Sequence, residues 1–289
     1  MLGVIVQLVI CSGLLHLQNL PHFSQMSPAE IDLFLQEMRR QEPDFTQRLI
    51  NVTDRFLGTR YLVSPLGEGP GHAPDTDPVM RFDAVDCVTL VEEAIALARS
   101  ESLEQANVVL QRIRYLNATI DYRYRKHFMM AQWIPDNQKS GFLEDITESI
   151  AGHATIWITK RLDPQIWNQR SNKHRWPDLT IDDIPNGEVR LPIVPIKRMK
   201  DFQPNVPDGA IMIIVRQDLP TIPERVSHIG IVVSHNGRRY VRHAASGKIG
   251  KVIDERLDAM IRRHIVYRRW PVAGYNFQRV LAGIEPRMP

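Results

Sequence analysis

The segment RFDAVDCVTLVEE, residues 81–93, decides how the chain is interpreted, because a cysteine follows an aspartate where an amphipathic pattern begins. Apolar side chains then recur at helical spacing, at Val88, Val91, Ala94, Ile95 and Ala98. Asp86, or Asp83 before it, is a good N-cap for a helix from Cys87 to about Ser100. The first turn of a helix favours a thiolate, so the pattern predicts a nucleophilic cysteine. The alternative is a small, buried, inert cysteine.

A second stretch, SHIGIVVSHNGRRYVRHAAS at residues 227–246, is typical of a β-hairpin. Its Asn236-Gly237 dipeptide favours a two-residue turn between two apolar strands. Such a turn pairs His235 with Arg238 and thereby sets the register of both strands.

Two histidines share one face of this hairpin. In the predicted register Gly230 lies opposite His243, and His228 is a diagonal neighbour of His243, with Cβ atoms roughly 6–8 Å apart. A thiol nucleophile needs a base within hydrogen-bonding reach, and that base needs a third group to fix its tautomer. Cys87, His228 and His243 supply these three groups. Two separate structural histidines, or a metal site, are the alternatives.

The rest of the chain places helices before strands. Helical patterns at residues 27–40 and 44–57 precede a Gly/Pro-rich loop at 58–80. Another helical pattern, at residues 103–116, follows the cysteine helix. Period-two or short apolar runs predict strands in the last third: residues 210–216, 228–234, 239–245 and 264–270. We interpret residues 121–206 as an insertion within a single catalytic domain of residues 23–289. The order predicts an α+β fold with a mainly antiparallel sheet.

The composition limits the function classes. Hydrophobic residues make up 43% of the 289 residues, enough for a full core. The 36 basic and 33 acidic residues leave a net charge of +3, too weak a bias to indicate nucleic acid. The sequence has two cysteines, Cys11 and Cys87, so we expect neither a disulfide framework nor a cysteine-rich zinc site.

Residues 1–22 form an apolar segment without charged side chains, and the first charged residue is Glu30. The apolar run from Met1 to Leu15 is shorter than the ~20 residues of a membrane span. We expect a signal-like segment and an exported, periplasmic protein without a stable membrane span. The alternative is an N-terminal helix packed on the domain of a cytoplasmic protein.

At these residues the chain resembles papain-like cell-wall hydrolases of the NlpC type. Gly58-Thr59-Arg60-Tyr61 resembles the Gly-Thr-x-Tyr block of that family, and FDAVDC at 82–87 resembles its Asp-Cys block. SHIGIV at 227–232 resembles the Ser-His-x-Gly-Ile-Val block, and RHAAS at 242–246 resembles the third triad block. The resemblance implies a papain-like fold in which the cysteine helix packs on the sheet.

A closer resemblance is to the N-acetylmuramoyl-L-alanine amidase-like branch. That branch has a threonine after the Asp-Cys-x unit, here Thr89, and an aromatic His-x-x-x-x-x-Trp segment, here residues 127–133. It also has a long insertion, here the region to Val206. With these features the similarity extends over most of residues 45–285.

The resemblance implies roles for the catalytic residues. Cys87 attacks an amide carbonyl, His228 takes the thiol proton and returns it to the leaving amine, and His243 orients His228. The backbone N–H of Cys87, with Tyr61 nearby, stabilises the oxyanion. Asp86 binds an ammonium or amide group of the peptide.

The resemblance also implies a peptidoglycan or muropeptide substrate cleaved between N-acetylmuramic acid and L-alanine, without a metal or another cofactor. Trp133 lines a sugar-binding groove in this interpretation, with aromatic core packing as its alternative. A γ-D-glutamyl endopeptidase and a thiol acyltransferase use the same residues. A zinc amidase would add Asp208 or Glu224 to the histidine pair. A non-catalytic module that binds wall or nucleic acid is a further alternative, and the oligomeric state is open.

Overall fold

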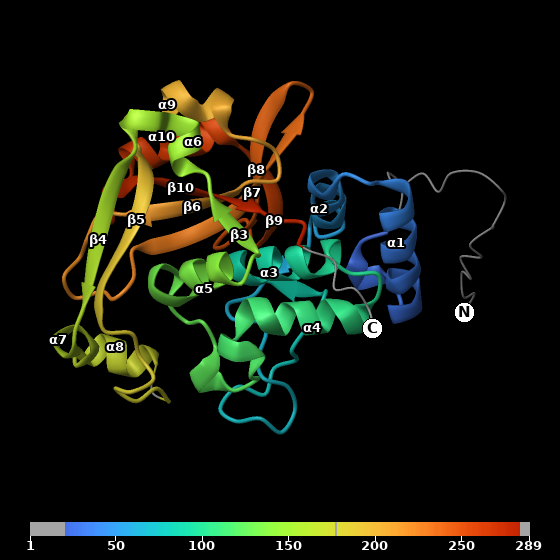
Figure 1. Cartoon of the computed structure of the whole chain (residues 1–289), viewed down its shortest axis with the longest axis horizontal. Coiled ribbons are helices and arrows are strands. Elements are labelled where there is room, and N and C mark those ends of the chain that lie inside the picture. Colours follow the sequence, from blue (N-terminus) through green and yellow to red (C-terminus); the bar gives the residue numbers. More distant parts are fainter. Residues whose placement is uncertain (1–20, 177, 284–289) are drawn as a thin grey trace.

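The helices of the N-terminal half form one layer of the protein (Figure 1). The computed structural model describes residues 21–176 and 178–283. The main helices of this layer are α1 (Pro28–Gln41), α2 (Phe45–Asp54), α3 (Cys87–Ala98), α4 (Leu103–Arg114) and α5 (Ile134–Lys139). A capping box of Ser27 and Glu30 starts α1, and the side chain of Asp86 caps α3. The predicted helices are confirmed, although α2, α3 and α4 end two or three residues early.

Within residues 21–176 and 178–283, ten strands form one curled sheet. They are β1 (Arg60–Tyr61), β2 (Ala84–Val85), β3 (Leu143–Asp145), β4 (Ile156–Leu162), β5 (Gly187–Pro195), β6 (Ile211–Arg216), β7 (Val226–His235), β8 (Arg238–Ala245), β9 (Lys251–Arg256) and β10 (Val272–Val280). Their order is β2-β1-β9-β8-β7-β6-β10-β5-β4, with β3 also paired to β10. Only the β1–β2 pair is parallel among the described residues, so the mainly antiparallel sheet and the α+β class are confirmed.

The sheet is buried on both faces. Alternate residues of β6 separate two cores: Ile211 and Ile213 pack in the core that contains α3, whereas Met212 and Ile214 pack with α10 (Leu257–Val266). Figure 1 shows α10 and its neighbours on the side of the sheet away from α3 and α4. Single turns and shorter helices connect the main elements: η2 (Phe23–Gln25), η3 (Leu116–Ala118), η4 (Tyr122–Tyr124), η5 (Met129–Trp133), α6 (Thr147–Ala151), η6 (Gly152–Ala154), α7 (Pro164–Trp167), α8 (Arg170–Arg175), α9 (Met199–Phe202) and η7 (Gln203–Asn205).

The predicted strand at 264–270 is wrong. This segment begins in the last turn of α10, where Met260, Ile261 and His264 bury a helical face on the sheet. The strand lies further along the chain, as β10, and occupies the middle of the sheet between β6 and β5.

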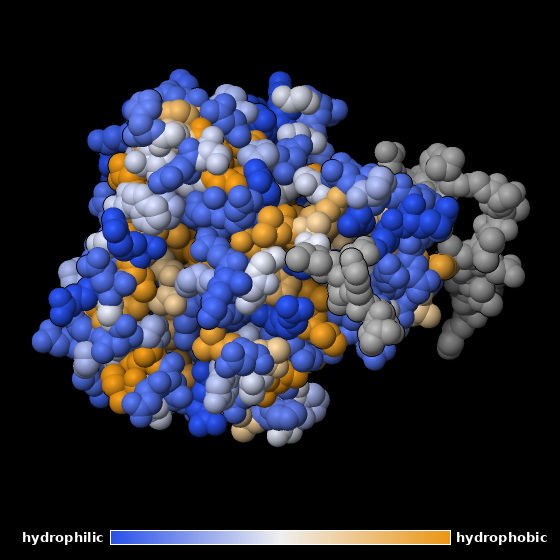
Figure 2. Space-filling view, viewed as in Figure 1, coloured by the Kyte–Doolittle hydropathy of each residue, from blue (hydrophilic) through white to orange (hydrophobic). Residues whose placement is uncertain are grey.

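The middle third of the chain extends the sheet. The interval 121–206, interpreted as an insertion, contributes β3, β4 and β5, and β5 pairs with β10. Figure 1 shows β4 and β5 as a long arm with α7 and α8 at its end, and Figure 2 shows apolar side chains gathered in that region. The limits 23–289 for a single domain stay a prediction.

The predicted N-terminal segment, residues 1–22, lies almost entirely outside the described residues, which begin at Pro21. Within the described ranges, no helix has the length and apolar character needed to cross a bilayer.

Candidate active site

Asp86 fixes the start of α3. Its Oδ1 accepts hydrogen bonds from the backbone N–H groups of Val88 (2.9 Å) and Thr89 (2.8 Å), while the Thr89 hydroxyl accepts one from the N–H of Asp86. Its Oδ2 accepts the N–H of Ser64 at 3.1 Å. The carboxylate that was predicted to contact substrate is therefore occupied by three backbone donors, which hold Cys87 in the first helical turn.

The thiol of Cys87 meets the sheet at the start of β7. The backbone N–H groups of Ile229, Cys87 and Val88 favour the anion of this sulfur and act to lower its pKa. Burial and the negative charge of Asp86 nevertheless raise the pKa of Cys87 to about 12. The predicted position at a helix start is confirmed, but the thiol of the free protein is neutral because desolvation outweighs these donors. Ile229 directly follows His228, so the cysteine helix and the histidine strand converge here.

The hairpin has the predicted register. His235 pairs with Arg238, and Asn236 and Gly237 have φ angles of 50° and 70°, as a tight hairpin turn requires. Nε2 of His228 lies 2.7 Å from Nδ1 of His243, and the two rings are nearly perpendicular, at 87°. The two histidines therefore share one hydrogen bond on one face of the sheet.

Gly230 leaves the space that this pair needs. A Cβ atom at this position would lie 2.7 Å from Val241 Cγ1, 2.8 Å from the carbonyl oxygen of Arg242 and 2.9 Å from His243 Cβ. Any side chain here would therefore displace the strand that carries His243.

Glu255 extends the histidine pair, and sequence reasoning missed it because β9 was not predicted. Its Oε2 lies 3.3 Å from Nε2 of His243, an ion-pair distance without the alignment of a full hydrogen bond. Arg263 holds the same carboxylate through Nε at 3.1 Å and Nη2 at 2.7 Å. Burial opposes ionisation, but the contacts with His243 and Arg263 lower the pKa of Glu255 to about 2.

The charge on Glu255 sets the tautomers of both histidines. A carboxylate beside Nε2 of His243 favours a proton on that nitrogen, which leaves Nδ1 of His243 as an acceptor. His228 then donates from Nε2, and its own Nδ1 carries a free lone pair. Burial, together with the neighbouring His243, lowers the pKa of His228 to about 3, so its imidazole is neutral.

The two aromatic residues predicted for the site lie in different places. Burial, together with the neighbouring Cys87 and Asp86, raises the pKa of Tyr61, in β1, to about 12. Its hydroxyl is therefore a neutral donor near the thiol. Trp133 is 1% exposed in the core, and its indole N–H donates to Glu92 at 2.8 Å. It offers no surface to a sugar, in agreement with the core-packing alternative.

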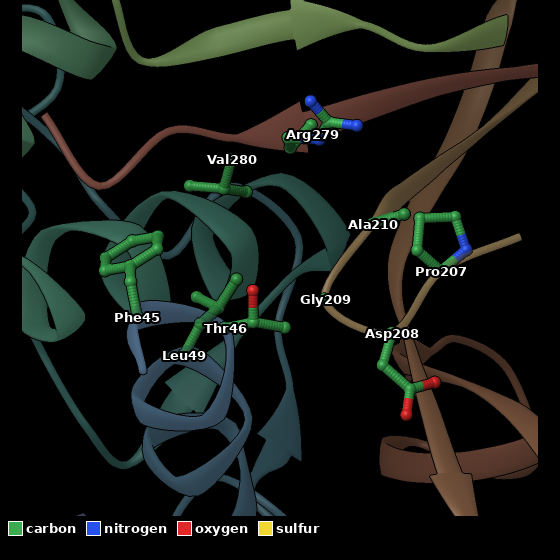
Figure 3. Close-up of a pocket in the computed structure, with 9 residues that line it drawn as sticks. All are labelled: Phe45, Thr46, Leu49, Pro207, Asp208, Gly209, Ala210, Arg279 and Val280. Carbon is green, nitrogen blue, oxygen red and sulfur yellow. The ribbon is translucent and has the colours of Figure 1, made fainter. Parts of the chain in front are cut away.

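The two acids proposed as zinc ligands bind other groups. Asp208 accepts the Ser234 hydroxyl at 2.7 Å and lines a separate pocket beside α2 (Figure 3). Glu224 accepts backbone N–H groups near η5 and at the start of β7, from Met130, Arg225 and Val226. Among residues 21–176 and 178–283, no three His, Cys, Asp or Glu side chains are grouped to hold a metal ion.

A cavity of about 570 Å³ opens beside the histidine pair. Its polar lining includes His228, His243 and Glu255 together with Arg216, Ser227 and Arg263. This volume and mixed lining are typical of a small-ligand site.

Residues 51–265 match the sequence pattern of the N-acetylmuramoyl-L-alanine amidase-like family. The chain belongs to this family. The match begins in α2 and ends in α10, so the amidase-like region contains the cysteine helix and all three strands that carry the candidate site. No curated protein matches the chain.

Solved structures share the fold. A Legionella pneumophila protein is 26% identical with a TM-score of 0.76, covering 88% of this chain and 94% of its own. An N-acetylmuramoyl-L-alanine amidase from Bacteroides uniformis is 24% identical with a TM-score of 0.61, covering 82% and 99%, and this likeness shows the fold alone. A Bacteroides fragilis protein named provisionally as a xylanase is 26% identical with a TM-score of 0.59, covering 79% and 98%. Family membership supports an amidase-like hydrolase.

Proposed function

We propose that the protein is a cysteine amidase that hydrolyses the bond between N-acetylmuramic acid and L-alanine in peptidoglycan fragments. Its membership of the N-acetylmuramoyl-L-alanine amidase-like family supports this reaction class. The observation that carries the cysteine mechanism is the packing of α3, which begins at Cys87, on β7 and β8, the strands that carry the histidine pair. The N–H of Ile229, the residue after His228, is among the groups that lower the pKa of the Cys87 thiol.

The neutral thiol and neutral imidazole define the first step. As the Cys87 sulfur attacks the lactyl carbonyl carbon, its proton passes to Nδ1 of His228, so that charge forms only during attack. His243 and the Glu255 carboxylate stabilise the imidazolium that results. The C–N bond then breaks, and His228 gives the proton to the leaving amine of L-alanine. Water, deprotonated by His228, hydrolyses the thioester and regenerates the thiol.

The oxyanion of the tetrahedral intermediate needs donors at the start of α3. The backbone N–H of Cys87 and the neutral hydroxyl of Tyr61 are the donors that we assign to it. The raised pKa of Tyr61 suits this role, because a phenolate would repel the oxyanion.

The arrangement of a cysteine helix packed on a histidine-bearing antiparallel sheet supports placement in the papain-like superfamily of NlpC type. Helix α3 contacts β7 and β8, the two strands that carry the histidines. An exported, periplasmic location fits a cell-wall substrate, and N-terminal sequencing of the mature protein from a fractionated cell tests it.

Mass spectrometry of defined muropeptides tests the proposal. We expect wild type to release free stem peptide, and Cys87→Ala to release none while keeping the thermal unfolding temperature. Cys11→Ser, the other cysteine variant, is the matched control and should remain active. Cleavage after D-glutamate would support a γ-D-glutamyl endopeptidase on the same residues. Activity that survives in Cys87→Ala but is lost with a chelator would instead support a metal amidase.

A further inference from the structure

We propose that Arg216 binds a carboxylate of the substrate and makes the enzyme specific for acidic stem peptides. This inference rests on the proposed function and names the part of the substrate that the cavity recognises. Arg216 ends β6 and lines the same cavity as His228 and His243. It was not among the residues predicted from the sequence.

The guanidinium of Arg216 is held in a fixed position. Its Nε donates to the Ser227 hydroxyl at 2.7 Å, and its Nη1 donates to the Trp270 carbonyl at 2.7 Å. The rings of Tyr267 and Trp270 lie 5.0 Å and 5.9 Å from its central carbon. Among the described residues Nη2 takes part in no hydrogen bond, so one edge of a rigid donor group is unused.

The charge of Arg216 also lacks a counter-ion. Arg263, the other guanidinium in the cavity, is paired with Glu255, whereas no carboxylate of the described ranges pairs with Arg216. Burial lowers the pKa of Arg216, which reflects the cost of keeping this cation partly out of water. A carboxylate supplied by a ligand would offset that cost and use the free Nη2.

Position indicates which part of a ligand supplies the carboxylate. Ser227, which orients Arg216, directly precedes His228, so the cation lies beside the candidate general base. A muropeptide has its neutral sugar on one side of the scissile bond and an acidic peptide on the other. We therefore assign the Arg216 side of the cavity to the peptide, and a free carboxylate rather than its carboxamide to the guanidinium.

Two substrates that differ only in this group test the assignment. One is a muramoyl peptide with a free D-glutamate carboxylate, and the other is its carboxamide. We expect wild type to prefer the acid by about 10- to 100-fold in kcat/KM, the range of a charge-assisted hydrogen bond. Arg216→Gln should lower turnover of the acid to that of the amide, and Arg216→Lys should retain part of the preference. Arg238→Gln, an exposed arginine of the β7–β8 turn, should behave as wild type.

The ratio of kcat/KM for the acid to kcat/KM for the amide distinguishes carboxylate recognition by Arg216 from a structural role of this residue. If Arg216→Gln lowers both substrates equally, or if wild type does not discriminate between them, the assignment is overturned. Calorimetric binding of both peptides to Cys87→Ala requires no hydrolysis. Arg216-dependent preference for the acid in that assay, without cleavage by wild type, would support the carboxylate site and contradict the amidase reaction. Cleavage by wild type without a preference for the acid in either assay would support the amidase reaction and contradict the carboxylate site.

Discussion

The carboxylate of Glu255 lies 3.3 Å from Nε2 of His243, on the opposite side of that ring from the hydrogen bond to His228. The histidine pair thus belongs to a longer series, which runs from His228 through His243 to an acid held by Arg263. The Glu255 carboxylate favours a proton on Nε2 of His243, and Nδ1 of His243 then accepts the hydrogen bond from Nε2 of His228.

Replacing Glu255 with Gln should reduce kcat with little change in KM. The amide removes the negative charge that fixes the His243 tautomer and stabilises the imidazolium of His228, and we expect a loss of about 10- to 100-fold. Glu255→Asp should recover part of the rate. Glu144→Gln, which breaks a surface pair with Arg279, is the matched control. Steady-state kinetics with muropeptide check this, and an unchanged kcat in Glu255→Gln would contradict the role of Glu255.

Activity should persist well below the ordinary pKa of histidine. The base form of His228 is neutral, and the folded-state pKa of about 3 means that falling pH removes this form only near that value. The unfolded chain takes up the same proton near pH 6.5, so His228 stabilises the fold fully above pH 6.5 and loses this contribution as pH falls towards 3. We expect kcat/KM to retain most of its value at pH 5. A half-loss near pH 6.5 would contradict this environment for His228.

Cys87 should react slowly with iodoacetamide at neutral pH. Because its pKa is about 12, the thiolate fraction at pH 7 is small, and we expect a rate roughly 100-fold or more below that of a free cysteine. The rate should rise with pH up to at least 10. Asp86→Asn keeps the helix cap but removes the negative charge, so it should increase reactivity. Rates are measured in a Cys11→Ser background, and a plateau at acidic pH would show a stable thiolate instead.

Gly230→Ala should impair the site through packing. The added methyl would lie within 2.9 Å of His243 Cβ and of the neighbouring backbone of β8, and we expect a cost of about 1–3 kcal/mol in the free energy of unfolding. Activity should fall further than stability explains, because His243 moves relative to His228. Gly141→Ala is a control for activity, because its added methyl meets no atom within 4 Å and the strain of its φ of 73° falls in a loop away from the site. Urea unfolding and kinetics on the same samples separate the two effects.

Local signals made much of the fold predictable. The capping residues Ser27 and Asp86 locate two helix starts because their side chains accept hydrogen bonds from the next turn. The Asn236-Gly237 turn predicts the β7–β8 register because few other dipeptides adopt its positive φ angles. The strand β10 was missed because the order of a sheet depends on long-range pairing, which no local pattern contains.

Local sequence signals likewise predict one part of the candidate site, whereas the other part depends on long-range contacts. The turn brings His228 and His243 together by local geometry, and the structure has them 2.7 Å apart. Glu255 lies on a short, highly charged strand whose alternation is weak, and Arg216 ends a strand that otherwise looks purely apolar. Their importance depends on neighbours that only the folded sheet supplies. The pKa of Cys87 likewise follows from burial rather than from its helix position.

The meeting of α3 and β7 has a consequence for how this protein acquires its reactivity during synthesis. Cys87 leaves the ribosome long before His228, and the strands of the arm lie between them in the chain. Under the proposed mechanism, an incomplete chain therefore contains the thiol without its proton acceptor, and hydrolysis requires the β7–β8 hairpin to be packed on α3.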